Sequence, residues 1–274
     1  MRLDHQTPGR APDGSAGDAD YGRIGVDYTA YRRPEPRIAA AIRDALGPAR
    51  KILNVGAGAG SYEPTDGDLV AVEPSAQMRA QRPAGLVEAI DATAEDLPFA
   101  DDTFDGAMAT FTVHQWHDLA AGLTEVRRVT RGPVAVLTCD PTLLSRYWLH
   151  EYAPEAIDTE ARRYPPVDKI AAALGGGQSF AVPIPLDCTD GFGEAYYGRP
   201  ERLLDPGARK ANSAWSFVPP EVHARFTEHL TRDLADGTWD AEYGHLRTQE
   251  HFDGSLVLIV SPGEDLYERT ATPQ

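Results

Sequence analysis

The 274-residue sequence contains only two cysteines, Cys139 and Cys188, and only three lysines. Two cysteines cannot form the dense disulfide framework of a small secreted protein. No apolar stretch follows a basic N-terminal start, and no apolar run approaches the ~18 residues of a membrane-spanning helix. We therefore expect a cytoplasmic protein with reduced cysteines and no membrane segment.

Positive charge is also scarce in this sequence. With 26 Lys and Arg residues against 42 Asp and Glu residues, the formal net charge is −16. Such a surface repels polyanions at long range, so neither nucleic acid nor an anionic membrane is an expected partner. A hydrophobic content of 42% is nevertheless enough to fill a core. Nothing in the sequence indicates the oligomeric state.

Residues 1–20 are rich in Gly, Pro, Asp and Ala and contain a single large aliphatic residue, Leu3. They cannot bury enough apolar surface to offset the entropy lost on ordering, so we predict a disordered tail. Because no repeat and no long linker divides the remainder, residues 21–274 are expected to form a single domain.

Short apolar runs alternate with helical patterns along most of the chain. Five runs have the length of strands that are covered on both faces: 51–55, 69–72, 86–90, 106–111 and 134–138. Strands that alternate with helices predict an α/β fold with a parallel sheet and right-handed crossovers. Further elements are expected as helices at 37–46, 119–130, 167–174 and 219–236 and strands at 180–186 and 256–260.

Three alternating glycines follow the first predicted strand in the sequence VGAGAG at residues 55–60. Without a Cβ, they let backbone N–H groups approach a ligand, although a simple tight turn would also explain them. Ser61 stands where a dinucleotide-binding fingerprint requires glycine. Only eight residues separate Gly60 from Leu69, and they include Pro64, so no full helix can form there to bind a phosphate. We therefore expect a ligand without a phosphate group.

Two further signals lie at the ends of the second and third predicted strands. Glu73 follows Gly56 by 17 residues, where a carboxylate can accept hydrogen bonds from both hydroxyls of a ribose. The alternative is a solvated glutamate at a strand end. The small residues of 93–99 would let an adenine ring lie against the backbone, and the alternative there is a polar loop whose turn is fixed by Pro98.

Six motifs, in order, resemble those of class I S-adenosylmethionine-dependent methyltransferases, specifically the small-molecule branch of ubiquinone/menaquinone and type 11 enzymes. They lie within residues 21–139: VGAGAG (55–60), VEPSAQM (72–78), AEDLPF (94–99), DDTFD (101–105), VHQWHD (113–118) and EVRRV (125–129). The resemblance implies a Rossmann-like sheet of seven strands, mostly parallel with an antiparallel last strand, and helices on both faces. It also implies S-adenosylmethionine as the cofactor.

The resemblance further implies which residues bind the cofactor. The methionine part is implied to contact Gly56, Ala57 and Gly58, the ribose to contact Glu73, and the adenine to contact Met78, Thr93 and Ala94. Phe111 is implied to lie in the same site. All of these residues follow predicted strands or lie next to their ends. Tyr28 and Arg32 are implied to close over the methionine carboxylate. Tyr31 or Arg33 are the alternatives for that role.

Two departures from the family pattern affect these expectations. Asn54 stands where the family usually has an acidic residue just before the glycines, so an amide contact would replace the acidic contact toward the ammonium end of the ligand. The short segment after Gly60 leaves one face of the sheet less covered, and we expect the N-terminal helix to cover it. Beyond Pro141 the chain matches the family only in outline.

Methyl transfer from a sulfonium is an in-line displacement, so positioning and exclusion of water supply much of the rate. An acceptor O–H or N–H group must also lose a proton. His114, just past the fourth predicted strand, is the candidate catalytic base, and its ordinary pKa of about 6.5 suits that role. The alternative is a structural histidine near the start of a helix.

No metal site is expected, although His114, His117 and Asp118 form the pattern H-x-x-H-D. No third ligand cluster is evident, and Asp118 fits better as the N-cap of the helix that begins at Leu119. Cys139 is expected to be a buried, inert thiol, because the acidic charge argues against an RNA-directed nucleophile.

The segments 141–178 and 187–218 are irregular and rich in aromatic residues. Long loops of this kind are often binding elements, and we expect 187–218 to be a cap insertion over the acceptor side of the pocket. Packing of these side chains into a satellite core is the alternative.

The function expected is methyl transfer from S-adenosylmethionine to a small organic acceptor, at an oxygen, nitrogen or carbon atom that the sequence does not specify. One alternative is an NAD(P)-dependent oxidoreductase, which Ser61 and the missing phosphate-binding helix disfavour. Another is a protein without transferase activity that keeps the fold and the cofactor pocket.

Overall fold

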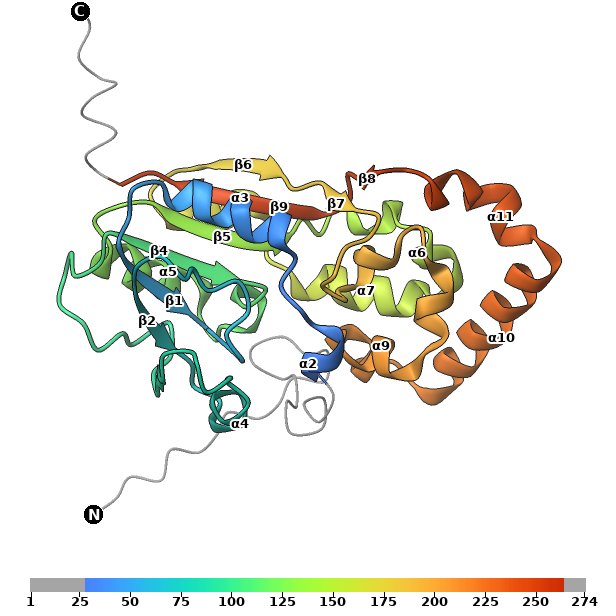
Figure 1. Ribbon diagram of the computed structural model, residues 1–274, viewed down its shortest axis with the longest axis horizontal. Helices are drawn as coiled ribbons and strands as arrows, with labels where there is room; N and C mark the ends of the chain where they lie inside the picture. The colour runs from blue at the N-terminus through green and yellow to red at the C-terminus, as the bar shows by residue number, and fades with distance from the viewer. Residues whose placement is uncertain (1–27, 264–274) are drawn as a thin grey trace, which may run out of the picture.

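A computed structural model describes residues 28–263, so the predicted tail at 1–20 lies outside the described residues. Seven strands form one sheet in the order β3-β2-β1-β4-β5-β9-β6, and helices cover both of its faces (Figure 1). The strands of this sheet are β1 (Lys51–Val55), β2 (Asp68–Val72), β3 (Ala89–Ile90), β4 (Gly106–Thr110), β5 (Val134–Cys139), β6 (Gln178–Ala181) and β9 (Leu256–Ser261).

The strand directions confirm the predicted fold class. Strands β1 to β5 pair in parallel, whereas β9 runs antiparallel between β5 and β6. The predicted strand at 86–90 is reduced to the two residues of β3. The predicted strand at 180–186 divides into β6 and β7 (Ile184–Pro185), because Pro183 has no N–H group to donate to the ladder. Strand β7 pairs instead with β8 (His251–Phe252).

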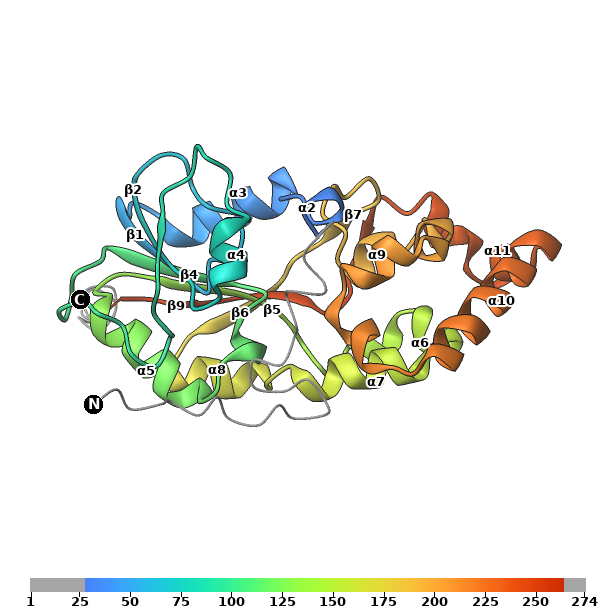
Figure 2. The same cartoon turned by 90° about the horizontal axis from the view of Figure 1, so that it is seen from below.

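One face of the sheet is covered by α3 (Pro36–Leu46), as expected from the short segment after the glycines. Residues 61–67 form turns and no helix. Glu35 caps the N-terminus of α3, and Gly47 ends the helix with a positive φ of 55°. Figure 2 shows α3 lying along this face of the sheet. The buried side chains of α3 are Ile38, Ile42 and Leu46, and they share one hydrophobic cluster with apolar residues of β1, β4 and β5.

The opposite face is covered by α5 (Leu119–Val129) and α8 (Val167–Ala173) (Figure 2). Leu123, Val126 and Val129 recur at helical spacing on α5 and are buried against the sheet together with Ile170 of α8. Both helices were predicted, with ends that differ by one residue. All six residues of β5, between these two layers, are buried.

A helical lobe, residues 144–163 and 193–247, lies beyond the carboxyl ends of β4 and β5 (Figures 1 and 2). Of its helices the sequence pattern predicts only α10 (Pro220–Asp236), and the residue that follows it, Gly237, has a φ of 84°. The α-helices of the lobe are α6 (Leu149–Tyr152), α7 (Pro154–Arg163), α9 (Pro206–Lys210), α10 (Pro220–Asp236) and α11 (Thr238–Tyr243). Two short helices, α2 (Tyr28–Tyr31) and α4 (Ala76–Ala80), lie outside the lobe.

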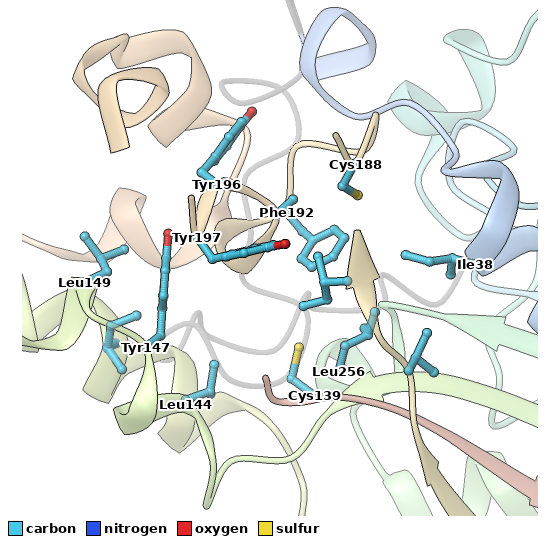
Figure 3. Close-up of a cluster of buried hydrophobic side chains, with 14 of the residues drawn as sticks. Ile38, Cys139, Leu144, Tyr147, Leu149, Cys188, Phe192, Tyr196, Tyr197 and Leu256 are labelled. Atoms are coloured by element: carbon cyan, nitrogen blue, oxygen red, sulfur yellow. The ribbon is translucent and has the colours of Figure 1, made fainter. Parts of the chain in front are cut away.

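Side chains from the helical lobe and from the sheet share one hydrophobic cluster. Figure 3 shows Tyr147, Phe192 and Tyr197 alongside Cys139 and Leu256 of the sheet. The aromatic residues of 187–218 are thus largely buried, as in the alternative of a satellite core. The role of this segment as a cap stays a prediction. Within residues 28–263, no helix is both long and apolar enough to cross a membrane.

Asp118 is the N-cap of α5, as predicted: its carboxylate accepts the N–H of Ala121 at 3.0 Å. We expect Asp118→Ala to lower the free energy of unfolding by about 1 kcal/mol, because one N–H at the start of the helix loses its partner. Asp118→Asn keeps an accepting oxygen and serves as the matched control. Urea denaturation measures both variants, and equal stability of the alanine and asparagine variants would contradict the capping role.

Candidate active site

The glycine turn, residues 56–60, leaves β1 at the carboxyl edge of the sheet. Gly56, Gly58 and Gly60 have positive φ values of 68°, 52° and 95°, which other residues rarely adopt. A Cβ on Gly56 would overlap the side chain of Thr112, and a Cβ on Gly58 would lie 3.3 Å from the Cε of Met78. The turn therefore brings backbone, without side chains, to the edge where parallel sheets bind ligands.

Glu73 fastens this turn to the end of β2. Its Oε2 accepts the N–H of Gly58 and its Oε1 accepts the N–H of Ser75, both at 2.8 Å. Burial raises the pKa of the carboxyl group above its ordinary value. Each carboxylate oxygen keeps a lone pair, so Glu73 can still accept hydrogen bonds from ligand hydroxyls.

The residues implied to contact adenine differ in exposure. Met78 on α4 is buried and reaches Gly58, so the structure brings these two together. Ala94 is buried and packs beside Gly122 of α5. Thr93 is exposed beyond β3. Met78 and Ala94 present apolar side chains, which suit contact with a flat ring.

A buried ion pair lies beside Asn54 that the sequence analysis missed. Asn54 Nδ2 donates to Glu63 Oε1 at 3.1 Å, and Arg82 Nη2 donates to both oxygens of Glu63 at 2.8 and 2.9 Å. Arg82 Nη1 also donates to the carbonyl of Gly58 at 3.3 Å. Glu63 therefore places a carboxylate next to Asn54, the position where the family usually has an acidic residue. The only signal in the sequence is an acidic residue in the short segment after the glycines.

Arg32 lies at the junction of the N-terminal segment and the helical lobe. Its Nε donates to Asp190 Oδ1 at 2.6 Å, and Asp190 Oδ2 also accepts the hydroxyl of Tyr62 at 2.7 Å. The guanidinium lies over the ring of Phe111, 5.1 Å from its centroid. Arg32 is thus close to the expected site and is already paired with a carboxylate.

The other N-terminal candidates are Tyr28, Tyr31 and Arg33. Tyr28 belongs to α2, but its side chain lies outside the described residues. The hydroxyl of Tyr31 donates to Asp205 Oδ2 at 2.7 Å, and Arg33 is exposed. Of these candidates, Arg32 has the geometry that best fits a role at the pocket.

Phe111 ends β4 in a conformation that is unusual for a bulky residue. Its φ is 51°, and that of Tyr62 is 64°. The two rings lie 6.4 Å apart, and Phe111 also packs against Phe192 at 5.5 Å. Strained backbone of this kind persists where the surrounding structure imposes it, and it concentrates at functional sites.

A cavity of about 80 Å³, here called the aromatic cavity, lies between the carboxyl ends of β4 and β5 and the helical lobe. Its wall combines rings with a few polar groups. The rings are Phe111, Tyr147, Tyr164, Phe192 and Trp215, and the ionisable groups include Arg32, His114, Glu160 and Glu194. Apolar walls with few polar groups are typical of small-molecule sites.

His114 lies in the wall of the aromatic cavity, on a 3₁₀ turn after β4, and is only 6% exposed. Burial lowers its pKa well below the ordinary value, and the charges of Arg163 and Arg32 act in the same direction. The ring is therefore neutral at physiological pH and does not titrate near 6.5, in contrast to the expectation from its ordinary pKa. Its Nδ1 has no hydrogen-bond partner within residues 28–263.

Two carboxyl groups in the aromatic cavity were not recognised from the sequence. Glu194 is 3% exposed, and burial raises its pKa to about 7, while the N–H and hydroxyl of Ser255 donate to its carboxylate. Burial also raises the pKa of Glu160, whose Oε2 accepts no hydrogen bond and lies 3.9 Å from Arg163 Nη1. The sequence pattern predicts neither a helix nor a strand at these two positions, so it gives no indication of where the two carboxyl groups point.

Cys139 and Cys188 are both buried free thiols. The burial of Cys139 confirms the expected buried thiol and raises its pKa, while its inertness stays a prediction. In the described part of the chain, no group of three His, Cys, Asp or Glu side chains is arranged to hold a metal ion.

Comparisons of sequence agree with this geometry. The family model described as "Methyltransferase domain", type 11, matches residues 53–135. A demethylmenaquinone methyltransferase of Mycolicibacterium paratuberculosis is 34% identical over 99 residues, which are 35% of this chain and 43% of that protein. The uncharacterized protein YafE of Escherichia coli is 47% identical over 47 residues, 17% of this chain and 23% of YafE. The chain thus spans less than half the length of these relatives.

Comparisons of structure extend over more of the chain. A crystal structure from Anabaena variabilis, of a protein described as a candidate methyltransferase of an antibiotic biosynthesis pathway, is 29% identical with a TM-score of 0.79. The match covers 84% of this chain and 98% of that one. The [4+2]-cyclase SpnF shares the fold at 12% identity and a TM-score of 0.50, over 89% of this chain and 93% of its own.

By fold and by sequence, the chain is therefore similar to class I S-adenosylmethionine-dependent methyltransferases, and the family model covers the part that includes the glycine turn and β4. Residues 53–135 carry the type 11 methyltransferase domain, and the cofactor of this class is S-adenosylmethionine. The NAD(P)-dependent alternative has no support from either comparison.

The raised pKa of Glu194 makes stability depend on pH. The folded chain releases this proton near pH 7 and the unfolded chain near 4.5, so stability falls as the pH rises through that interval. At pH 8 this group lowers the free energy of unfolding by about 3 kcal/mol relative to its value at acidic pH. We expect Glu194→Gln to lack this loss, so that its stability relative to the parent rises between pH 5 and 8.

Urea denaturation at a series of pH values measures this effect. Glu88→Gln, at an exposed position, is the control and should follow the parent at every pH. If the free energy of unfolding of the parent and of Glu194→Gln changes with pH in parallel, the Glu194 carboxyl group does not titrate differently in the folded and the unfolded chain.

Proposed function

We propose that this protein transfers a methyl group from S-adenosylmethionine to a small organic acceptor held in the aromatic cavity, in the cytoplasm. The observation that carries the proposal is the junction at the end of β4. Thr112 packs against Gly56 of the glycine turn, while its neighbour Phe111 lines the aromatic cavity. Two consecutive residues thus join the expected cofactor site to an apolar cavity, which is the arrangement that an in-line transfer requires.

The residues at the sheet edge suit the cofactor. The glycine turn offers backbone where a Cβ would meet Met78 or Thr112, and Glu73 keeps lone pairs for two hydroxyl donors. When bound, S-adenosylmethionine supplies an electrophilic methyl group on a sulfonium. The residues assigned to hold it are Gly56, Ala57, Gly58, Glu73, Met78, Thr93, Ala94, Phe111 and, from the N-terminal segment, Tyr28 and Arg32.

The aromatic cavity supports the reaction mainly by position and by exclusion of water. Its rings shield the acceptor from solvent, and the strained end of β4 fixes Phe111 between the two sites. His114 is assigned as the group that hydrogen-bonds the reacting end of the acceptor and takes its proton. Because the ring is neutral, it does not repel the positive charge of a sulfonium.

The remaining alternative is a protein that keeps the fold without transferring a methyl group. SpnF, described as a cyclase, has the same fold, so the fold alone does not establish transfer. What favours transfer is the type 11 domain match over the residues that form the glycine turn and β4.

Ligand binding tests the cofactor assignment. Calorimetry should detect S-adenosylmethionine and S-adenosylhomocysteine with similar, roughly micromolar dissociation constants, since both carry the same adenosine and amino-acid ends. NADH is the control ligand and should not bind. Binding of NADH without either adenosyl compound would overturn the assignment, and conversion of bound S-adenosylmethionine to S-adenosylhomocysteine with acceptor present tests transfer itself.

Glu73 provides a test of the ribose contact. Glu73→Ala should weaken binding of S-adenosylhomocysteine by about 10- to 100-fold, because two hydroxyl donors lose their acceptor and the Gly58 turn loses a hydrogen bond. Glu88→Ala, an exposed change near β3, should leave the affinity unaltered. An unchanged affinity in Glu73→Ala would show that the ribose lies elsewhere.

A further inference from the structure

The aromatic cavity holds two carboxyl groups that come from different parts of the helical lobe. Glu160 lies on α7 and Glu194 on the 3₁₀ turn at Gly193–Tyr196, and both line the cavity. The charge of Glu160 acts on Glu194, so the two groups are close enough to interact. Like charges that share a buried site are unfavourable unless a cation joins them.

The surrounding protein supplies little positive charge to this pair. Glu194 forms no ion pair within residues 28–263, and its partner is the backbone and hydroxyl of Ser255. Glu160 Oε2 forms a loose ion pair with Arg163 Nη1 at 3.9 Å, and its side chain is 22% exposed. Arg32 lines the cavity as well, but its guanidinium is paired with Asp190 at 2.6 Å.

Aromatic rings form much of the remaining wall. Tyr147, Tyr164 and Trp215 are buried, and they line the cavity together with Phe111 and Phe192. Ring faces attract organic cations, and desolvation strengthens this attraction. Rings combined with two carboxyl groups, of which only Glu160 has an ion pair within residues 28–263, are therefore suited to an ammonium ion.

The polar atoms that lack partners point to the same kind of ligand. Within residues 28–263, Glu160 Oε2 accepts no hydrogen bond and His114 Nδ1 has no hydrogen-bond partner. His114 is more than nine-tenths buried and lines the cavity. Buried polar atoms without partners are costly, so a ligand with N–H groups would relieve Glu160 Oε2.

We propose that the acceptor is a basic amine, bound as an ammonium ion against the carboxyl groups of Glu160 and Glu194 and among the rings of the aromatic cavity. Before transfer, the ammonium gives one proton to a carboxylate of this pair; its nitrogen lone pair then forms the bond to the methyl carbon as the carbon–sulfur bond of the sulfonium breaks, which leaves S-adenosylhomocysteine. This inference rests on the proposed function, since it names the acceptor class of the same site. A carboxylic acid is disfavoured by the two carboxyl groups. A neutral alcohol would leave their charge uncompensated.

Three probes with the same phenylethyl group test the amine. The protein is first saturated with S-adenosylhomocysteine, and phenethylamine, 2-phenylethanol and phenylacetate are then titrated by calorimetry. Phenethylamine should bind about tenfold or more tightly than the other two. Benzyltrimethylammonium, whose charge does not depend on pH, extends the cation series.

Charge-neutral variants show which groups recognise the amine. Glu194→Gln and Glu160→Gln should each weaken phenethylamine binding by about tenfold or more and should change 2-phenylethanol binding by less than about threefold. Glu155→Gln is the matched control, because Glu155 lies on the same helix α7, at an exposed position, and pairs with Arg225. Unchanged affinity for S-adenosylhomocysteine verifies that each variant is folded.

The outcomes separate this inference from the proposed function. If S-adenosylhomocysteine does not bind, the proposed function fails. If it binds but no amine of the series does, or if phenylacetate or 2-phenylethanol binds as tightly as phenethylamine, the acceptor is not a basic amine. An amine that binds equally well to the parent and to both glutamine variants would also overturn the inference.

Discussion

The seven residues between the glycine turn and β2 impose the main constraint on this molecule. A helix usually follows the glycines of such a sheet and covers one of its faces, but this segment forms only turns. The face would be open to water, and α3 buries it instead with Ile38, Ile42 and Leu46. The N-terminal part of the chain is therefore an integral layer of the fold.

The same short segment supplies polar contacts on which the site depends. Glu63 places a carboxylate beside Asn54, and Arg82 links it to the carbonyl of Gly58. Tyr62 hydrogen-bonds Asp190, which also holds Arg32. One short turn thus joins the glycine turn, the N-terminal segment and the helical lobe. Loss of either partner in the buried pair would leave a charge without compensation.

Periodicity and motifs predict the sheet well, because buried parallel strands are short apolar runs and α5 and α8 have clear apolar faces. The glycine turn and the Asp118 cap are equally local, since each depends on residues within a few positions. The carboxyl groups of Glu160 and Glu194 could not be predicted, because their surroundings come from segments distant in sequence. His114 was recognised by its place after β4, but its lowered pKa depends on burial that only the tertiary structure provides.

The position of β9 has a consequence for synthesis of the chain. Residues 256–261 lie between β5 and β6, so β5 has its second neighbour only after the more than one hundred residues that separate it from β9 have been made. Until then its apolar edge can pair with other nascent chains. Strands β1 to β4 are made much earlier and can assemble first. The half of the protein that carries the glycine turn can thus form early, whereas the aromatic cavity is completed later, because its wall includes residues as far along the chain as Trp215.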